Sequence, residues 1–467
     1  MDFITKITDF LWGIPMMSIL VFGGIFFTIR LGFFQFIKLP HILSETFGKL
    51  FRKNNEGEGT VTPFQATTSA LASTLGAANL VGVPVAIAFG GPGAIFWMWV
   101  VAIFGIATKY SEVVLGMKYR EKNDQGEYVG GPMYYMKNGL KWNKVAIFFA
   151  FALMLEIGAS IMVQTNSIAK SISGSFSIPA IAVGIAMIII VYLGVYGGIK
   201  SISRMTEKLV PFMVTFYIIG ITIILVYYYK EIPAMISLIF TSALQPISAV
   251  GGFAGAGVAQ AIRWGLARGL YSNEAGMGTA PIAHSTAQNV HPAKQGFWGA
   301  FEVIVDTMIV STMTALAVLV SGAWKEISAE NAALMVTKAF TPVFGKEFAG
   351  IFVSITLFVL VITTVLVIAF YGEKQAEFLF GSKFSLFMRF VYLGAIIVGS
   401  IGGLQFIWKF LDLLLALVVI PNMIAILCLS KEVKMITNDY FKRYLVEQKR
   451  GTIHESTTET ITNRNAN

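Results

Sequence analysis

The feature that most constrains this chain is a series of apolar blocks, each about 20 residues long. An α-helix rises about 1.5 Å per residue, so a block of this length crosses the roughly 30 Å hydrocarbon core of a bilayer. The 467 residues are 55% hydrophobic and only 13% charged, whereas a soluble domain carries about 25% charged residues. A chain with so few charges cannot cover a soluble surface, and we predict an all-α, multi-pass membrane protein.

We predict eleven membrane spans from these blocks. They cover residues 11–31, 63–88, 92–117, 145–170, 178–197, 209–229, 247–267, 297–321, 349–370, 384–402 and 405–429. The block 233–245 is too short to span, and we expect an interfacial helix on the outer side. The first ten residues carry Asp2 and Asp9 against a single Lys6. This is unlike the basic start of a signal peptide, so we expect the first span to remain in the mature protein.

The basic residues predict the orientation of these spans. All but seven of the 35 Lys and Arg fall on one side if the N-terminus is outside and the C-terminus cytoplasmic; the seven are Lys6, Lys170, Lys230, Lys325, Lys338, Lys346 and Lys409. Basic loops stay in the cytoplasm, so we predict this orientation in a bacterial cytoplasmic (inner) membrane. The net charge of +9 therefore indicates the lipid bilayer as partner and no nucleic acid. We expect 431–467 to be a cytoplasmic tail, disordered after Gly451.

Two of the spans are poor helices by composition. The span 63–88 has Ser73-Thr74-Leu75-Gly76-Ala77-Ala78-Asn79 at its midpoint, and 247–267 contains four glycines within 251–257. Glycine costs about 1 kcal/mol relative to alanine inside a helix, so both helices can open there. Secondary transporters bind substrate and ions at such unwound helices, although small residues also serve close helix packing.

The positions of the two breaks favour the transporter interpretation. Each opens a group of five spans, one group in 63–229 and the other in 247–430, after an extra N-terminal transmembrane helix within 1–37. Five spans per half reverse the second copy, so we predict a 5+5 inverted repeat.

Polar groups within the spans are further candidates for function, because they are costly at membrane depth. Glu302 and Asp306 share one helix face, and Glu156 lies in another span. We expect Glu302 and Asp306 either to bind ligand or to be tied structurally to Arg263 or a helix end. Lys109 and Glu112, at the end of the span 92–117, are expected to form a cytoplasmic salt bridge.

Two adjacent threonines, Thr363 and Thr364, interrupt an aliphatic run. Their hydroxyls, together with freed carbonyl groups, suit a hard cation such as Na⁺. The alternative for each threonine is a hydrogen bond back to its own helix.

Enzyme signatures are missing from the sequence. There is no phosphate-binding loop, no His-x-x-x-His pair and no nucleophile with a partnered base, and Cys428 is the single cysteine. We therefore predict a transporter that is not an enzyme and has no organic cofactor.

Three stretches resemble the sodium:alanine symporter family (alanine or glycine:cation symporters). The first runs from Gly90-Gly91-Pro92-Gly93 to Lys109-Tyr110-Ser111-Glu112, and the second from Gly252-Phe253-Ala254-Gly255 to Ser272-Asn273-Glu274-Ala275-Gly276-Met277-Gly278. The third is Thr363-Thr364 followed by Tyr371-Gly372-Glu373-Lys374. The likeness covers almost the whole chain apart from the tail.

This resemblance implies a leucine-transporter (LeuT) type fold that carries one small neutral amino acid with Na⁺ by alternating access, functional as a monomer. It implies the following substrate-binding residues: Gly76, Ala77, Ala78, Asn79, Gln164, Gly252, Phe253, Ala254, Gly255, Thr364 and Ile368. The backbone amides of Gly76, Ala77 and Ala78 would hold the substrate carboxylate, and Phe253 would act as a lid. Na⁺ would lie between carbonyl groups near Ala72 and Leu75 and the hydroxyls of Thr363 and Thr364.

Two departures from the family pattern bear on the substrate. The family commonly has Gly-Thr-Gly-Asn at the first break, where this chain has Gly76-Ala77-Ala78-Asn79, and often tryptophan where this chain has Ile368. The missing indole should enlarge the pocket, so we hypothesise that glutamine, rather than alanine or glycine, is the leading substrate. Two alternatives remain: proton coupling through Glu156 or the Glu302/Asp306 pair, and a channel or sensor on the same scaffold.

Overall fold

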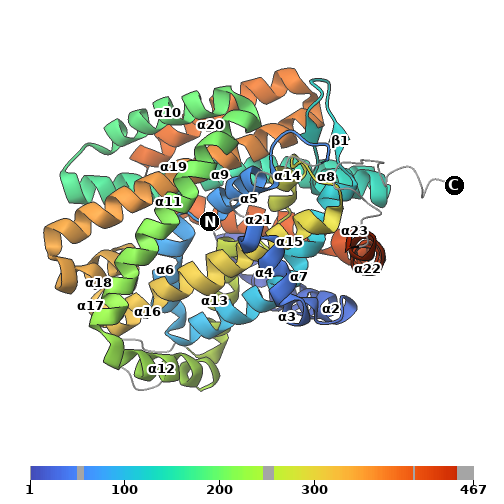
Figure 1. Cartoon of the computed structure of the whole chain (residues 1–467). Coiled ribbons are helices and arrows are strands. Elements are labelled where there is room, and N and C mark those ends of the chain that lie inside the picture. Colours follow the sequence, from blue (N-terminus) through green and yellow to red (C-terminus); the bar gives the residue numbers. More distant parts are fainter. Residues whose placement is uncertain (1, 50–56, 246–256, 403–404, 450–467) are drawn as a thin grey trace.

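The computed structural model describes residues 2–49, 57–245, 257–402 and 405–449. Most of them lie in helices packed into one bundle, and the strands β1 (Glu121–Lys122) and β2 (Tyr128–Val129) form a short antiparallel hairpin. Figure 1 shows the bundle with the long helices α9, α11 and α19 crossing it.

The helices of the first half lie between residues 2 and 227. They are α1 (Asp2–Leu11), α2 (Ile14–Arg30), α3 (Phe34–Ile37), α4 (Leu39–Glu45), η1 (Phe47–Lys49), α5 (Pro63–Thr74), η2 (Ala78–Gly82), α6 (Val83–Gly90), α7 (Gly93–Lys118), α8 (Pro132–Tyr134), η3 (Tyr135–Gly139), α9 (Asn143–Phe176), α10 (Ala180–Tyr196) and α11 (Gly198–Tyr227).

The helices of the second half lie between residues 229 and 449. They are η4 (Tyr229–Glu231), α12 (Ile232–Leu244), α13 (Val258–Asn273), α14 (Ala280–His284), α15 (Pro292–Val303), η5 (Ile304–Ser311), α16 (Thr312–Val320), α17 (Ala323–Glu326), η6 (Ala329–Leu334), α18 (Met335–Phe344), α19 (Lys346–Phe380), α20 (Ser382–Ile401), α21 (Gln405–Cys428), α22 (Ser430–Asp439), η7 (Tyr440–Tyr444) and α23 (Leu445–Lys449).

Eight helical stretches of the described chain are long and apolar enough to cross a membrane. They are Pro63–Gly90, Gly93–Lys118, Asn143–Gly174, Gly198–Tyr227, Pro292–Val320, Lys346–Phe380, Ser382–Ile401 and Phe410–Cys428. Two more predicted spans correspond to the shorter apolar helices α2 and α10, and 247–267 is described only from residue 257 onward. The chain is therefore a multi-pass membrane protein, and the number eleven, the domain boundaries and the 5+5 repeat stay predictions.

The packing of the helices brings α5, α9 and α19 together. The long helices α9 and α19 pack along each other, α19 also contacts α5, and α7 packs against both α13 and α15. The centre of the bundle is formed by helices far apart in the sequence, and polar groups meet there across 292 positions (Ala72 and Thr364) and 298 positions (Ser73 and Tyr371).

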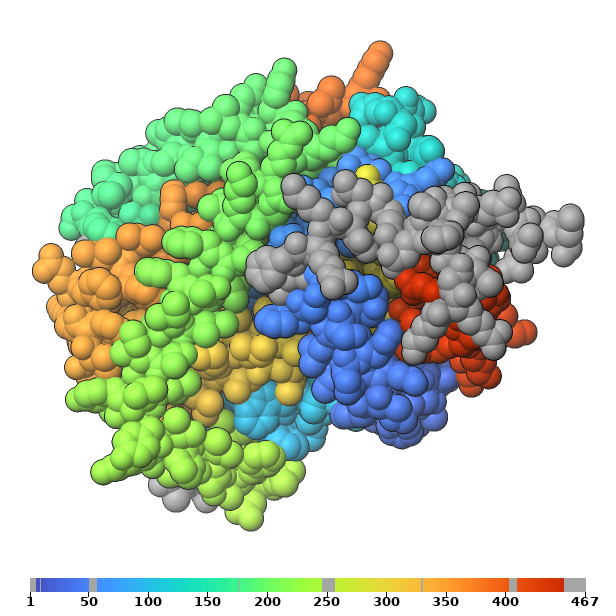
Figure 2. Space-filling view, viewed as in Figure 1, coloured from blue at the N-terminus to red at the C-terminus, as the bar shows by residue number. Residues whose placement is uncertain are grey.

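The outer surface of the bundle is apolar where lipid would cover it. On α11, which runs across the face seen in Figure 2, Phe212 is 67% exposed and Val226 is 65% exposed. Exposed rings and aliphatic side chains of this kind are unfavourable in water and favourable in hydrocarbon. They agree with a membrane environment.

Two short segments flank the bundle. The block 233–245, expected to be too short to span, forms the 13-residue helix α12. Residues 430–449, including most of the predicted tail before Gly451, form α22, η7 and α23. The part of the tail that we expect to be disordered lies outside the described residues.

Candidate functional site

The predicted interruption of the helix 63–88 is present. The first half, α5, begins with a capping box, in which the Thr62 hydroxyl accepts from Gln65 N and the Gln65 side chain accepts from Thr62 N. It ends at Thr74 because Leu75 has a non-helical backbone, with φ −79° and ψ 82°. The helix resumes at Ala78. Leu75 and Gly76 therefore form the unwound segment between two helical halves, since Ala77 already has helical dihedral angles (φ −59°, ψ −20°).

The amide groups freed by this break are held by side-chain oxygens. Gly76 N donates to Asn79 Oδ1 at 3.2 Å, and Ala77 N donates to Gln164 Oε1 on α9, also at 3.2 Å. A Cβ atom on Gly76 would lie 2.7 Å from Thr364 Oγ1, closer than such atoms normally approach. Glycine at 76 thus lets α5 and α19 come together at the break.

The carbonyl groups freed by the break face Thr364 on α19. In a continuous helix, Gly76 N would bond Ala72 O and Asn79 N would bond Leu75 O, but Gly76 N contacts Thr74 O and Asn79 N contacts Gly76 O. The Thr364 hydroxyl lies 2.7 Å from Ala72 O, 3.5 Å from Leu75 O and 2.9 Å from Leu360 O. Four oxygens from two helices therefore meet at one buried point.

The neighbouring threonine has a different arrangement. The Thr363 hydroxyl lies 2.9 Å from Leu360 O and 3.1 Å from Val359 O, both on its own helix. This is the bond back to the helix that is the expected alternative for an isolated threonine. Both threonine side chains are buried. Of the two hydroxyls, Thr364 Oγ1 contacts carbonyl groups of the broken helix, whereas Thr363 Oγ1 contacts carbonyl groups of α19.

Asn79 links the break to the helix that carries Asp306. Its Nδ2 donates to Asp306 Oδ1 at 2.8 Å, and Ser272 Oγ donates to Asp306 Oδ2 at 2.7 Å. Ser311 Oγ also lies 3.0 Å from Asn79 Nδ2. Asp306 thus supports the break through Asn79. Ser272 stands in the second stretch that resembles the family, but nothing in its local spacing marks it as a partner of Asp306.

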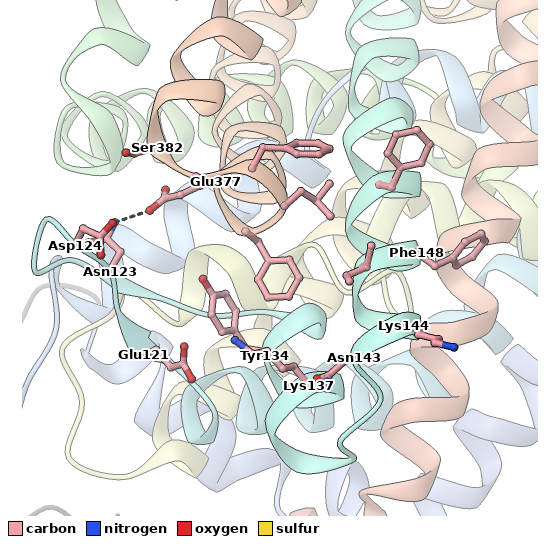
Figure 3. A pocket seen from close by; sticks show the side chains of 16 residues that line it. Glu121, Asn123, Asp124, Tyr134, Lys137, Asn143, Lys144, Phe148, Glu377 and Ser382 are labelled. Carbon is pink, nitrogen blue, oxygen red and sulfur yellow. Dashed lines mark hydrogen bonds between the residues drawn. The ribbon is translucent and has the colours of Figure 1, made fainter.

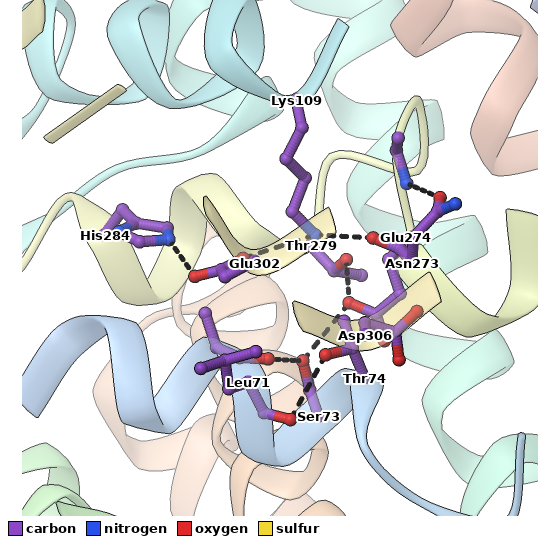
Figure 4. A network of polar contacts seen from close by, with 12 residues as sticks. Leu71, Ser73, Thr74, Lys109, Asn273, Glu274, Thr279, His284, Glu302 and Asp306 are labelled. Carbon is purple, nitrogen blue, oxygen red and sulfur yellow. Dashed lines mark hydrogen bonds and ion pairs between the residues drawn. The ribbon is translucent and has the colours of Figure 1, made fainter. Parts of the chain in front are cut away.

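A second polar network lies beside α5, as Figure 4 shows. Lys109 Nζ donates to Asn273 O at 2.9 Å and lies 3.6 Å from Glu302 Oε2, while the other oxygen of Glu302 bonds His284. All three ionisable side chains are buried. Glu302 is therefore tied to Lys109 and His284, and it points to different partners from Asp306 on the same helix.

The predicted salt bridge between Lys109 and Glu112 is wrong, because each side chain binds residues of other helices or loops instead of its neighbour on α7. Lys109 pairs with Glu302, whereas Glu112 accepts from Gly276 N and from Asn422 Nδ2. Both side chains are fully buried, at 0% exposure.

A small cavity adjoins the break. It is lined by Ser73, Ala78, Glu156, Ile157, Ser160, Gln164, Tyr271, Glu274, Met277, Thr279, Thr364 and Ile368. Its free volume is about 10 Å³, close to the space that one water molecule needs. The described site is therefore closed around its own side chains, and it must widen to admit a molecule of amino-acid size.

The structure brings together Ala72, Leu75, Gly76, Ala77, Ala78, Asn79, Gln164, Thr364 and Ile368 among the residues predicted for the site. The second break, with Gly252, Phe253, Ala254 and Gly255, lies outside the described residues. Sequence reasoning did not single out Ser160, Tyr271 or Met277, which also line the cavity.

A larger pocket lies away from the break and is shown in Figure 3. Its volume is about 770 Å³, and its lining comes from the β1–β2 hairpin, α8, η3, the start of α9, the end of α19 and the start of α20. The lining includes Glu121, Lys144, Phe148, Glu377 and Ser382. Because the freed backbone groups and the buried polar side chains lie elsewhere, size alone does not identify the functional site here.

A broken helix at the centre of a multi-pass bundle, with freed amides and carbonyls facing buried polar side chains, is the architecture of a secondary transporter. Comparison with solved structures agrees on the fold. The crystal structure of MhsT in complex with L-phenylalanine is similar with a TM-score of 0.60 at 12% identity, covering 80% of this chain and 89% of that one.

Sequence comparison identifies the family. The model of the sodium:alanine symporter family matches residues 1–455, and the chain belongs to this family. It is 50% identical to the uncharacterized transporter YflA of Bacillus subtilis, over 94% of this chain and 93% of the other. It is 39% identical to the sodium/alanine symporter AgcS of Methanococcus maripaludis (92% and 95%), and 34% identical to the probable sodium/glutamine symporter GlnT of Bacillus subtilis (93% and 89%).

Proposed function

We propose that this protein takes up a small neutral amino acid together with Na⁺ by alternating access. It would lie in a bacterial cytoplasmic membrane with its N-terminus outside and its C-terminus inside, and act as a monomer. The observation that carries this proposal is the pairing of Thr364 Oγ1 with the freed carbonyl of Ala72 beside the freed amides of Gly76 and Ala77. Freed carbonyls suit a cation and freed amides suit a carboxylate.

The amides of Gly76, Ala77 and Ala78 would bind the substrate carboxylate. The first two now bond Asn79 Oδ1 and Gln164 Oε1, which are oxygen acceptors like the carboxylate that would replace them. Gln164 would then be free to donate from its amide nitrogen to the same carboxylate. The second break, 252–255, would close over the substrate, with Phe253 as a lid.

Sodium would bind to oxygens of α5 and α19. Ala72 O, Leu75 O, Leu360 O and Thr364 Oγ1 already lie together, and neutral oxygens are suitable ligands for a hard cation. Thr363 would join them by turning its hydroxyl away from Val359 O. When bound, Na⁺ would supply a positive charge that holds the unwound segment against α19.

Glutamine is the substrate that we propose, with alanine and glycine as the alternatives. Ile368 lines the cavity one helical turn beyond Thr364, where the family often has tryptophan, and the smaller side chain would leave space for a longer substrate once the site widens. Among the relatives, AgcS is named a sodium/alanine symporter and GlnT a probable sodium/glutamine symporter. These names support both amino acids as candidate substrates.

Accumulation in proteoliposomes tests the proposal. An inward Na⁺ gradient should drive uptake of labelled glutamine above equilibrium, and replacing Na⁺ by choline should abolish it. Proton coupling, the rival mechanism, predicts uptake that survives choline and collapses when the pH gradient is dissipated. Flux without accumulation under either gradient would favour a channel.

A further inference from the structure

One end of the cavity at the break carries a buried acid with unused bonding capacity. Glu156 on α9 lines the cavity and is only 2% exposed, and within the described chain its carboxyl group has no hydrogen-bond or ion-pair partner. The other acid of the lining, Glu274, accepts from Thr279 Oγ1 at 2.6 Å and Ser73 Oγ at 3.2 Å. A buried carboxyl group without partners costs free energy, so Glu156 is the lining acid that gains most from a ligand.

A phenol group lies close enough to Glu156 to interact with it electrostatically. Tyr271, near the end of α13, also lines the cavity, and its buried hydroxyl makes no hydrogen bond of normal geometry within the described residues. A carboxylate can only accept hydrogen bonds, whereas a phenol donates one. Together the two groups offer one acceptor and one donor to whatever enters.

The helical spacing on α9 places Glu156 on the same helix face as Gln164, which contacts the break. Glu156, Ser160 and Gln164 follow each other at intervals of four residues, so they share one face with steps of about 6 Å along the helix axis. Gln164 bonds the Ala77 amide, where we propose that the substrate carboxylate binds. Glu156 therefore lies about 12 Å along the axis from that point, with the cavity between them.

The rest of the cavity lining is mixed, with polar side chains such as Ser73, Thr279 and Glu274 beside an apolar group. Ile157, Met277 and Ile368 line the cavity together with Ser160. The methylene groups of a substrate side chain could pack on the apolar part of this lining, and a polar group at its tip would meet Glu156 and Tyr271. The side chain of alanine is too short to reach this end.

We propose that Glu156 and Tyr271 bind the side-chain carboxamide of glutamine and so determine the preference for glutamine over alanine. The carboxamide NH₂ donates to the Glu156 carboxylate, and the carboxamide oxygen accepts from the Tyr271 hydroxyl. This inference rests on the proposed function, since it places the substrate carboxylate at Gly76 and Ala77. It makes both residues specificity-determining.

Competition between unlabelled amino acids tests the subsite in the wild-type protein. Glutamine should inhibit labelled glutamine uptake at concentrations about tenfold lower than methionine, which is of similar length but apolar, because unpaired buried polar groups reject the apolar analogue. Glutamate should compete at least as weakly as methionine, since its carboxylate faces that of Glu156. Methionine competing as well as glutamine, or alanine competing better, would overturn the proposal.

Two variants test the individual residues. Tyr271→Phe removes one hydroxyl, and Glu156→Leu removes the acid at similar size. Each should raise the KM for glutamine about tenfold more than the KM for alanine. Ser167→Ala on the same helix is the matched control, because Ser167 bonds Val163 O of its own helix and the change should leave both KM values unaltered.

The outcomes separate this inference from the proposed function. If Na⁺ drives alanine uptake and the Glu156 and Tyr271 variants change the KM values for glutamine and alanine equally, the subsite is overturned and the symport proposal stands. If Glu156→Gln reduces the uptake of glutamine and of alanine equally and flattens the pH dependence of uptake, Glu156 would be assigned to proton transfer and the subsite overturned. Absence of sodium-dependent uptake for any neutral amino acid would overturn both.

Discussion

The hydroxyl of Thr364 on α19 lies 2.7 Å from the backbone carbonyl of Ala72 on α5, although 292 residues separate them in the sequence. This contact joins the helix that is broken at Leu75 to the helix that packs along α9. Any ion or substrate that changes the distance between these two helices therefore changes the shape of the break. The contact gives the proposed coupling a defined location.

Replacing Thr364 should impair sodium use more than protein abundance. Thr364→Ala removes the oxygen that faces Ala72 and Leu75, and losing about 1 to 2 kcal/mol of cation binding should raise the sodium concentration for half-maximal uptake roughly 5- to 30-fold. Thr363→Ala is the matched comparison and should have a smaller effect, because its hydroxyl bonds its own helix. Reduced abundance with an unaltered sodium requirement would make Thr364 a structural residue.

A methyl group at Gly76 should disrupt the packing of the break against α19. Gly76→Ala would place Cβ 2.7 Å from Thr364 Oγ1 and 3.3 Å from Gln164 Nε2, so either α19 moves away or the unwound segment changes shape. We expect loss of most uptake. Gly82→Ala is the control, since no atom lies within 4 Å of the position that its new methyl group would take and alanine favours helix. Equal activity of the two variants would contradict the close approach at Gly76.

Breaking the buried ion pair should destabilise the fold. Lys109→Met leaves the buried carboxyl of Glu302 without its cation, and losing one partner of a buried pair costs about 3 to 5 kcal/mol. Thermal unfolding in detergent measures this loss, and the double change with Glu302→Gln should recover part of it. Lys122→Met, in a pair with Glu58 that is about half exposed on both sides, should cost no more than about 1 kcal/mol. A Lys109 variant as stable as the Lys122 variant would refute this interpretation of the pair.

Acid should loosen the helix α22. His291 caps α15 by accepting from Ala293 N through Nδ1, and its Nε2 donates to Asp439 at the end of α22. Burial lowers the pKa of His291, and the hydrogen bond from His291 lowers the pKa of Asp439. As pH falls below about 6.5, the ordinary pKa of histidine, His291 is protonated in the unfolded chain before it is protonated in the folded one. The free energy of unfolding should therefore decrease below that pH.

A non-titrating replacement tests this pH dependence. His291→Asn keeps an oxygen for Ala293 N and an amide for Asp439, so it should be nearly as stable as the wild type at about pH 7.5 and lose less between about pH 7 and 5.5. Melting temperatures across that range provide the measurement. Parallel curves for the two proteins would show that another group titrates.

The sequence predicted the first break well because its cause is local. Gly76, with Ser73, Thr74 and Asn79 nearby, weakens the helix locally, and α5 ends at Thr74. The contact of Thr364 with Ala72 was expected only through the family resemblance, since no local pattern links α5 to α19. The second break, around Gly252, lies outside the described residues and stays a prediction.

The polar partners of the site could not be predicted in the same way. The spacing of Lys109 and Glu112 suggested a pair within one helix, but Glu302 approaches from α15 and Gly276 and Asn422 satisfy Glu112. Likewise, Ser272 and Asp306 reach Asn79 only once α13 and η5 are packed against η2. Such contacts depend on how distant helices pack, which composition and periodicity do not specify.

The most direct test of the central claim is the affinity of the purified protein for labelled glutamine and alanine as the sodium concentration varies at constant ionic strength. Binding of Na⁺ should raise the affinity for the amino acid, and binding of the amino acid should raise the affinity for Na⁺, because linkage is reciprocal. We predict that affinity for the amino acid rises with Na⁺, that choline does not replace Na⁺, and that Thr364→Ala weakens the rise while Thr363→Ala weakens it less. Equal affinity in sodium and in choline would contradict sodium-coupled binding at this site.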